Sequence, residues 1–179
     1  MKFAATGIPD CMRLVAEPIE DERGFFARTF CEDAFAAAGI PFRTVQSAVT
    51  FSPAIFTLRG MHWQATPSHE AKIVRVMRGR IFDVVIDLRP ASPTYLGHVG
   101  VELGSGRLDG LHVPPGCAHG FLTLEPDTEV LYQMADVHRP ELARGVRFDD
   151  PLFAIAWPAP PQVILERDAT YPDHVPEAG

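Results

Sequence analysis

Proline and glycine interrupt this chain so often that long helices have little room to form. The sequence holds 17 Pro and 14 Gly, spread from end to end, and both residue types weaken or end helices. The runs between them are short and rich in β-branched and aromatic side chains, which favours β-strands. We therefore predict an all-β fold, with strands at residues 55–64, 72–77, 80–88, 97–103, 107–113, 120–124 and 129–136.

The clearest element is a predicted hairpin over residues 71–88. Its two runs, KIVRVM and RIFDVVIDL, are joined at Arg78 and Gly79, and short β-rich runs on either side of a glycine are typical of a hairpin. A series of such strands separated by turn residues indicates a β-sandwich or a jelly-roll barrel.

One short helix is expected near the N-terminus, at residues 30–38. Thr29 and Glu32 have the spacing of a capping box, the body is rich in alanine, and Gly39 follows its end. The last twenty residues are rich in proline, so we expect them to be irregular and to lie on the surface.

Length and charge narrow the class of protein. With 179 residues, 46% of them hydrophobic, we expect a single domain over residues 1–179. The formal charge of −7 argues against a nucleic-acid partner, because such proteins carry an excess of Lys and Arg. No run approaches the roughly 18 apolar residues of a membrane span, and the N-terminus lacks a secretory pattern. We therefore expect a cytoplasmic protein with no membrane partner.

Cysteine and lysine are scarce in this chain, and their positions indicate further features of the fold and the site. Cys11, Cys31 and Cys117 show no paired short spacing, so we expect buried or half-buried thiols and not disulfides or a thiolate metal site. The basic residues are 14 Arg and only two Lys, and Lys72 lies in an apolar run. Because an ammonium group does chemistry that a guanidinium does not, Lys72 is a candidate functional residue.

Alternation along the predicted strands groups several polar side chains. Residues two apart face the same way. If these strand faces line the barrel interior, they form one polar pocket among apolar side chains. Its residues would be His62, Lys72, Asp83, His119 and Tyr132. Such a concave site is typical of ligand binding. Taken singly, each residue also fits a structural role, such as a lysine that reaches solvent, so spacing alone leaves the assignment open.

A metal site is the main chemical alternative, since jelly-roll barrels often bind a metal through histidines and a carboxylate. Two positions after His62 stands Gln64, and an amide is a poor ligand for transition metals. His69 and Glu70 are adjacent, so on a strand they would point to opposite faces. We therefore expect no metal.

Several longer strings carry a family resemblance. They are DERGFF from Asp21, LRGMHWQ from Leu58, KIVRVMRGRIFDVVIDLR from Lys72, SPTY from Ser92, VPPGCAHGF from Val113, LY at Leu131, and DDP with IAWP from Asp149. In this order and spacing, the chain resembles the dTDP-4-dehydrorhamnose 3,5-epimerases over nearly its whole length. The resemblance implies a cupin-type jelly roll and a homodimer in which an N-terminal strand helps to complete the neighbour's site. It also implies no metal or other cofactor.

The resemblance further implies a reaction and its residues. A nucleotide-linked 4-keto-6-deoxyhexose has acidic hydrogens at C3 and C5, so a base forms an enolate and an acid reprotonates the opposite face. The implied catalytic residues are His62 as base, Asp168 as its orienting carboxylate, Lys72 as the cation at the enolate oxygen, and Tyr132 as acid. The implied substrate contacts are Arg23 and Arg59 at the diphosphate, Phe26 and Gln46 near the nucleobase, a pair of His119 and Asp83, and also His138 and Arg167.

The chain departs from the family pattern mainly at residues that would recognise the substrate. Ala48 replaces an expected amide, Arg28 an acidic residue, and Arg167 a lysine, while Val137 and His138 stand where two tyrosines are usual. The nucleobase, the sugar and the number of carbons inverted therefore stay open. Other classes that remain are a metal-dependent cupin, which Gln64 opposes, and a non-catalytic sugar-binding cupin, which the intact catalytic set opposes.

Overall fold

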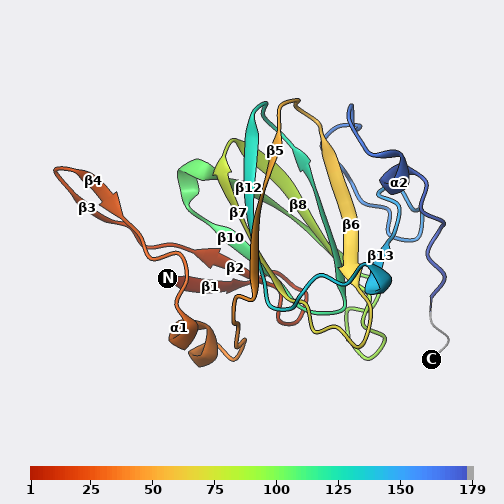
Figure 1. The fold of residues 1–179 in the computed structure, drawn as a ribbon, viewed down its shortest axis with the longest axis horizontal. Coiled ribbons are helices and arrows are strands. Elements are labelled where there is room, and N and C mark those ends of the chain that lie inside the picture. The colour runs from red at the N-terminus through yellow and green to blue at the C-terminus, as the bar shows by residue number, and fades with distance from the viewer. Residues whose placement is uncertain (177–179) are drawn as a thin grey trace.

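Two antiparallel β-sheets packed face to face form the body of the protein in the computed structural model, which describes residues 1–176 (Figure 1). The six-stranded sheet has the order β1 (Lys2–Ala5), β2 (Met12–Val15), β10 (Gly110–Val113), β7 (Lys72–Arg78), β12 (Thr128–Met134) and β5 (Gln46–Ser52). The five-stranded sheet has the order β13 (Ala143–Gly145), β6 (Leu58–Gln64), β11 (Cys117–Thr123), β8 (Arg80–Asp87) and β9 (His98–Gly104). The predicted all-β, cupin-type jelly roll is confirmed.

An apolar core joins the inner faces of the two sheets. Val74 and Val76 alternate inward from β7 and pack in one cluster with Val85 of β8 and Phe121 of β11. Burying each side chain of this kind stabilises the fold by about 1.5–3 kcal/mol. The inward face of β7 begins with Lys72, so the strand that builds the core also leads into the polar site.

The predicted hairpin over residues 71–88 is wrong in its pairing. Both strands form near the expected bounds, but β7 pairs with β10 and β12, whereas β8 pairs with β9 and β11. The chain crosses between the sheets at Gly79, which has a positive φ of 81° and lies directly against Thr128. In a double-sheet jelly roll, consecutive strands can belong to opposite sheets, and here this topology overrides closeness in sequence.

The predicted N-terminal helix is present but shorter. α1 spans Glu32–Ala37, and no side chain caps its start, so the expected capping box of Thr29 and Glu32 does not form. Phe35 instead holds the helix in place, because its ring is fully buried in an apolar cluster beside the six-stranded sheet. Packing therefore stabilises this helix more than local capping does.

The sequence patterns missed the strands nearest the N-terminus, together with β5 and β13. Among the missed strands, β3 (Ile19–Asp21) and β4 (Gly24–Phe26) form a hairpin that projects away from both sheets (Figure 1). The side chains of Ile19, Phe25 and Phe26 in this hairpin are 70%, 60% and 67% exposed. An exposed apolar surface of this kind is a candidate interaction surface.

The remaining elements are short. Two 3-10 turns, η1 (Ser105–Arg107) and η2 (Pro140–Leu142), link strands. The C-terminal segment is irregular as predicted over residues 160–176, apart from α2 (Glu166–Ala169), and the last three residues of the prediction lie outside the described part of the chain. None of the helices within residues 1–176 is long and apolar enough to cross a membrane.

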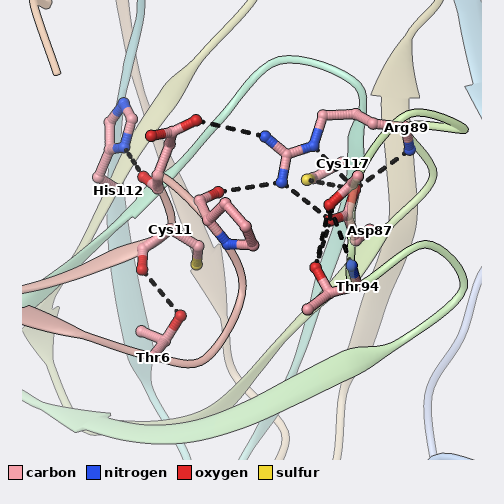
Figure 2. Close-up of polar contacts among 10 residues, drawn as sticks. Thr6, Cys11, Asp87, Arg89, Thr94, His112 and Cys117 are labelled. Atoms are coloured by element: carbon pink, nitrogen blue, oxygen red, sulfur yellow. Dashed lines mark hydrogen bonds and ion pairs between the residues drawn. The ribbon is translucent and has the colours of Figure 1, made fainter.

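A buried carboxylate ties the loop after β8 to the N-terminal turn (Figure 2). Asp87 accepts hydrogen bonds from Arg89 Nε at 2.8 Å, Ser92 Oγ at 2.5 Å and Thr94 Oγ1 at 2.7 Å. Arg89 Nη2 also donates to the Pro9 carbonyl at 3.0 Å. Burial by itself raises the pKa of Asp87, but these donors outweigh burial and hold that pKa below its usual range. The loop is thereby fixed at the end of the strand that carries Asp83.

The cysteines are thiols, as predicted. Cys11 and Cys117 are buried and Cys31 is half-buried, and all three are free. Burial raises the pKa of the Cys11 and Cys117 thiols to about 12. They therefore stay protonated and act as small apolar side chains of the core.

Candidate active site

Two glycines let β6 and β11 approach closely enough to set two histidines side by side. A Cβ on Gly120 would lie 2.8 Å from the Cα of Gly60 and 2.6 Å from Met61 Sδ, so no larger residue fits here without movement. Two positions after Gly60 on β6, His62 is the cross-strand partner of His119. Cross-strand partners project from the same side of a sheet. Backbone packing thus brings the two histidines to one site.

His62 forms a dyad with a carboxylate from the far end of the chain. Its Nε2 lies 2.8 Å from Oδ1 of Asp168, which α2 places with only 2% of its side chain exposed. The other oxygen of Asp168 accepts the Gly60 N–H at 3.3 Å. Burial raises the pKa of Asp168, but the hydrogen bond from His62, with help from Arg167 and Gly60, outweighs burial and leaves that pKa below its usual value.

The dyad fixes the tautomer that a base requires. Because Asp168 is ionised, we assign the Nε2 proton of His62 to this hydrogen bond. Nδ1 then carries the lone pair. Arg167 Nε also binds Asp168 Oδ1, at 3.0 Å, and its Nη2 lies 3.3 Å from His62 Nε2, so a fixed positive charge stands behind the imidazole.

A second pair of histidine and carboxylate lies deeper. His119 Nε2 is 2.5 Å from Asp83 Oδ1, and their side chains are 4% and 0% exposed. The ring of Tyr132, on β12, packs edge-on against His119 with centroids 6.2 Å apart. Burial raises the pKa of the Tyr132 phenol, so at neutral pH the hydroxyl keeps its proton and can donate it.

Two cavities meet at these groups and share an edge formed by His62, Glu70, Lys72 and His138. One cavity, of about 240 Å³, is otherwise lined by Ala48, Arg59, His119, Tyr132 and Met134. The other, of about 210 Å³, is otherwise lined by Trp63, Gln64, Ala143, Arg144, Arg167 and Tyr171. The structure thus brings His62, Lys72, His119 and Tyr132 together as the strand alternation predicts, with Asp83 directly behind His119.

Lys72 is held by two acceptors at the shared edge. Its Nζ lies 3.2 Å from Glu70 Oε2 and donates to the His62 carbonyl at 3.5 Å. An ammonium has three donors, so one N–H is left for a ligand. The side chain of Lys72 is only 15% exposed, which strengthens its electrostatic effect on a bound oxygen.

Some of the expected substrate contacts line a cavity, and others lie outside both cavities. Arg59 lines the first cavity, where its Nε donates to Ser52 Oγ at 3.2 Å. Gln46 lines neither cavity; its Oε1 accepts the His138 backbone N–H at 2.7 Å and so fixes His138 at the shared edge. Arg23 and Phe26 lie on the projecting hairpin, outside both cavities, and within one chain the structure does not bring them to the site.

Sequence reasoning missed Glu70, Arg144, Trp63 and Tyr171 as lining residues. Glu70 stands two positions before Lys72, so the alternation that selected Lys72 also pointed to Glu70; His69 lines a different cavity, as adjacent residues should. Tyr171 packs edge-on against His62, with ring centroids 6.2 Å apart. No sequence pattern marks Tyr171, because it belongs to the irregular C-terminal segment.

The arrangement is suited to moving protons. It offers a base with an orienting carboxylate, a protonated phenol and a half-buried cation in one place. Among residues 1–176, no group of three or more His, Cys, Asp or Glu side chains could hold a metal ion.

Comparisons with known proteins agree with this chemistry. The sequence model of the dTDP-4-dehydrorhamnose 3,5-epimerase family matches residues 5–174. A dTDP-4-dehydrorhamnose 3,5-epimerase of Sinorhizobium fredii is 36% identical over 96% of this chain and 89% of its own length. A dTDP-4-dehydrorhamnose 3-epimerase of Streptomyces niveus is 32% identical over 94% of this chain and 81% of its own length.

Solved structures show the same fold. A 3,5-epimerase from Bacillus anthracis, with TDP and pyrophosphate bound, superposes with a TM-score of 0.92 at 34% identity, over 96% of this chain and 98% of that one. An epimerase from Legionella pneumophila in complex with dTDP-4-keto-L-rhamnose superposes with a TM-score of 0.87 at 34% identity, over 94% and 89% of the two chains. The fold, the His62–Asp168 site and these similarities together place this chain in the dTDP-4-dehydrorhamnose 3,5-epimerase family.

Proposed function

We propose that this isomerase epimerises C3 and C5 of a nucleotide-linked 4-keto-6-deoxyhexose, converting a sugar of the dTDP-4-dehydro-6-deoxyglucose type to the dTDP-4-dehydrorhamnose type. The observation that carries the proposal is the dyad of His62 and Asp168 in the same pocket as Tyr132 and Lys72. All four belong to one domain, and the chemistry needs no metal or other cofactor.

The first step is removal of a proton alpha to the C4 carbonyl. His62 Nδ1 takes the proton from C3 or C5, the electron pair of the broken C–H bond moves into the ring, and the carbonyl oxygen becomes an enolate oxygen. Asp168 stabilises the imidazolium that results. Lys72 Nζ donates to the enolate oxygen, where negative charge develops in the transition state.

The second step returns a proton to the other face of the same carbon. Tyr132 supplies it from its phenol, and the enolate electron pair forms the new C–H bond as the carbonyl is restored. The phenolate then regains a proton from solvent, and His62 releases to solvent the proton that it took. Because the donor and the base face opposite sides of the ring, the configuration at that carbon is inverted.

The other site residues hold the substrate. Arg59 lines one cavity and Arg167 lines the other, and the guanidinium group of Arg59 suits the diphosphate. Asp83 acts through His119, and Gln46 acts through His138. Support for the nucleotide part of the substrate comes from the TDP bound in the Bacillus anthracis neighbour.

The protein acts as a homodimer in this proposal. The hairpin of β3 and β4 carries Arg23 and Phe26 away from their own chain, with an apolar surface exposed. A second copy would cover this arm and receive Arg23 at its diphosphate and Phe26 at its nucleobase. The cytoplasmic location stays a prediction.

Mixing two inactive variants tests the shared site. His62→Ala and Arg23→Ala chains are each expected to be inactive or nearly so, but their heterodimer contains one site with both residues intact. In an equimolar co-refolded mixture about half of the dimers are heterodimers, so the mixture should regain about a quarter of the wild-type epimerisation rate per dimer. If mixtures stay as inactive as the parents, Arg23 does not act across subunits.

A narrower activity is the second candidate. The Streptomyces niveus relative is a 3-epimerase, and Val137 and His138 stand where the family pattern usually has two tyrosines. The number of carbons inverted depends on how the sugar lies between His62 and Tyr132, so both groups would serve a one-carbon epimerase equally well.

Solvent exchange tests the function. The protein is incubated with dTDP-4-keto-6-deoxyglucose in deuterated water, and the hydrogens at C3 and C5 are followed by NMR. Deuterium at both carbons is expected. Deuterium at C3 alone would support the narrower epimerase, and deuterium at neither carbon would contradict the proposal for this substrate.

A further inference from the structure

Glu70 is the one carboxylate among the described lining residues of the two cavities, and it lines both of them. Its side chain is only 6% exposed. The other groups at the shared edge, His62, Lys72 and His138, are cationic or can become so. A buried carboxylate among such groups requires partners, and Lys72 is the partner within the chain.

The segment that carries Glu70 is held rigidly. The Glu70 backbone N–H donates to Ser68 Oγ at 3.2 Å, and that hydroxyl donates to Asp136 Oδ2 at 2.9 Å. Gln64 Nε2 also donates to Ser68 Oγ, at 3.3 Å. The backbone of Glu70 is therefore held before a ligand arrives, and the ion pair with Lys72 orients its carboxylate, which is the condition for a selective polar contact.

The ion pair with Lys72 determines which part of the sugar Glu70 can reach. Lys72 Nζ lies 3.2 Å from Glu70 Oε2, and under the proposed function the same Nζ binds the C4 oxygen. A ligand group next to that oxygen thus lies beside the carboxylate. Of the two ring carbons that flank C4 in a 4-keto-6-deoxyhexose, C3 bears a hydroxyl and C5 bears a methyl group. A carboxylate accepts a hydrogen bond from a hydroxyl but gains nothing from a methyl group.

We propose that Glu70 is a specificity-determining residue whose carboxylate accepts a hydrogen bond from the 3-hydroxyl of the keto-sugar while it holds Lys72 at the neighbouring carbonyl. This inference rests on the proposed function and names the substrate feature that the site selects. A sugar that lacks the 3-hydroxyl leaves a buried charge with one partner fewer, and sites of this kind discriminate strongly against such analogues.

The test compares the wild-type protein and two variants on two substrates. The substrates are dTDP-4-keto-6-deoxyglucose and its 3-deoxy counterpart, and the measured rate is deuterium exchange at C5, a position present in both. A hydrogen bond to a charged group corresponds to a preference of about 10- to 100-fold in kcat/KM, which we expect of the wild-type protein. Glu70→Ala should lower this preference below about 3-fold. Glu70→Gln, which keeps the shape and a neutral acceptor, should retain an intermediate preference.

The control is Glu102→Ala on β9, which removes an exposed carboxylate from its ion pair with Arg80 of β8, away from both cavities. It should leave the preference unchanged. Equal losses on both substrates in Glu70→Ala would overturn the inference, since Glu70 would then act on Lys72 or on folding alone. Calorimetric binding of the two sugars measures the preference in the bound ground state and does not depend on the exchange rate. A wild-type protein that shows the binding preference but no exchange would therefore contradict the proposed function and not the role of Glu70.

Discussion

The His62→Ala variant is expected to lose deuterium exchange at both C3 and C5 of the 4-keto sugar, by about 10³-fold or more in kcat/KM. Both positions are affected because one imidazole removes both protons in the proposed mechanism. Substrate binding should change much less than kcat, since the cationic groups that hold the diphosphate are untouched. Exchange is measured by NMR in deuterated water, and binding by calorimetry.

Two further variants sharpen this result. Asp168→Asn keeps the shape of the dyad but removes the charge that fixes the tautomer of His62, so its kcat should also fall, by about 10²- to 10⁴-fold. His98→Ala removes an exposed histidine of β9 and should behave as the wild type. Near-normal exchange in His62→Ala would show that another group is the base.

The Tyr132→Phe variant is expected to separate exchange from inversion. His62 can still form the enolate and return a deuteron to the same face, so exchange should persist within about tenfold of the wild-type rate. Inversion needs the proton of the missing phenol and should slow by about 10²-fold or more. Chiral analysis of the product beside the NMR exchange signal measures both rates in one sample.

The substitution is conservative for the fold. The ring of Tyr132 packs against those of His119 and Phe121, and phenylalanine keeps these contacts. Tyr95→Phe, outside both cavities, serves as the control and should retain both activities. If Tyr132→Phe lost exchange and inversion to the same degree, the hydroxyl would act in enolate formation and not as the opposing acid.

The polar pocket was predictable because it depends on a local rule. Side chains alternate along a strand whatever the strand pairs with, so the inward positions of His62, Lys72, His119 and Tyr132 follow from their own segments. The error in pairing β7 with β8 did not disturb this result. Either pairing leaves the inward face of each strand unchanged.

The features that the sequence did not predict correctly depend on contacts between residues far apart in the sequence. Strand pairing follows the jelly-roll topology, and no local signal at Gly79 separates a hairpin from a crossover. α1 is held by the burial of Phe35 and not by its capping residues. The pairing of His62 with Asp168 spans 106 positions, so only the family resemblance could suggest it. Glu70 had a usable signal in its spacing from Lys72, because residues two positions apart on an extended segment face the same way.

The most direct test of the central claim is a crystal structure with dTDP-6-deoxyglucose, which lacks the keto group and so cannot form the enolate. We expect the sugar ring to lie between His62 Nδ1 and Tyr132 Oη, with C3 or C5 within about 3–3.5 Å of Nδ1 and the C4 oxygen on Lys72 Nζ. A complex in which His62 and Tyr132 lie on the same face of the sugar ring, or in which the sugar is bound outside the two cavities, would contradict the proposed mechanism.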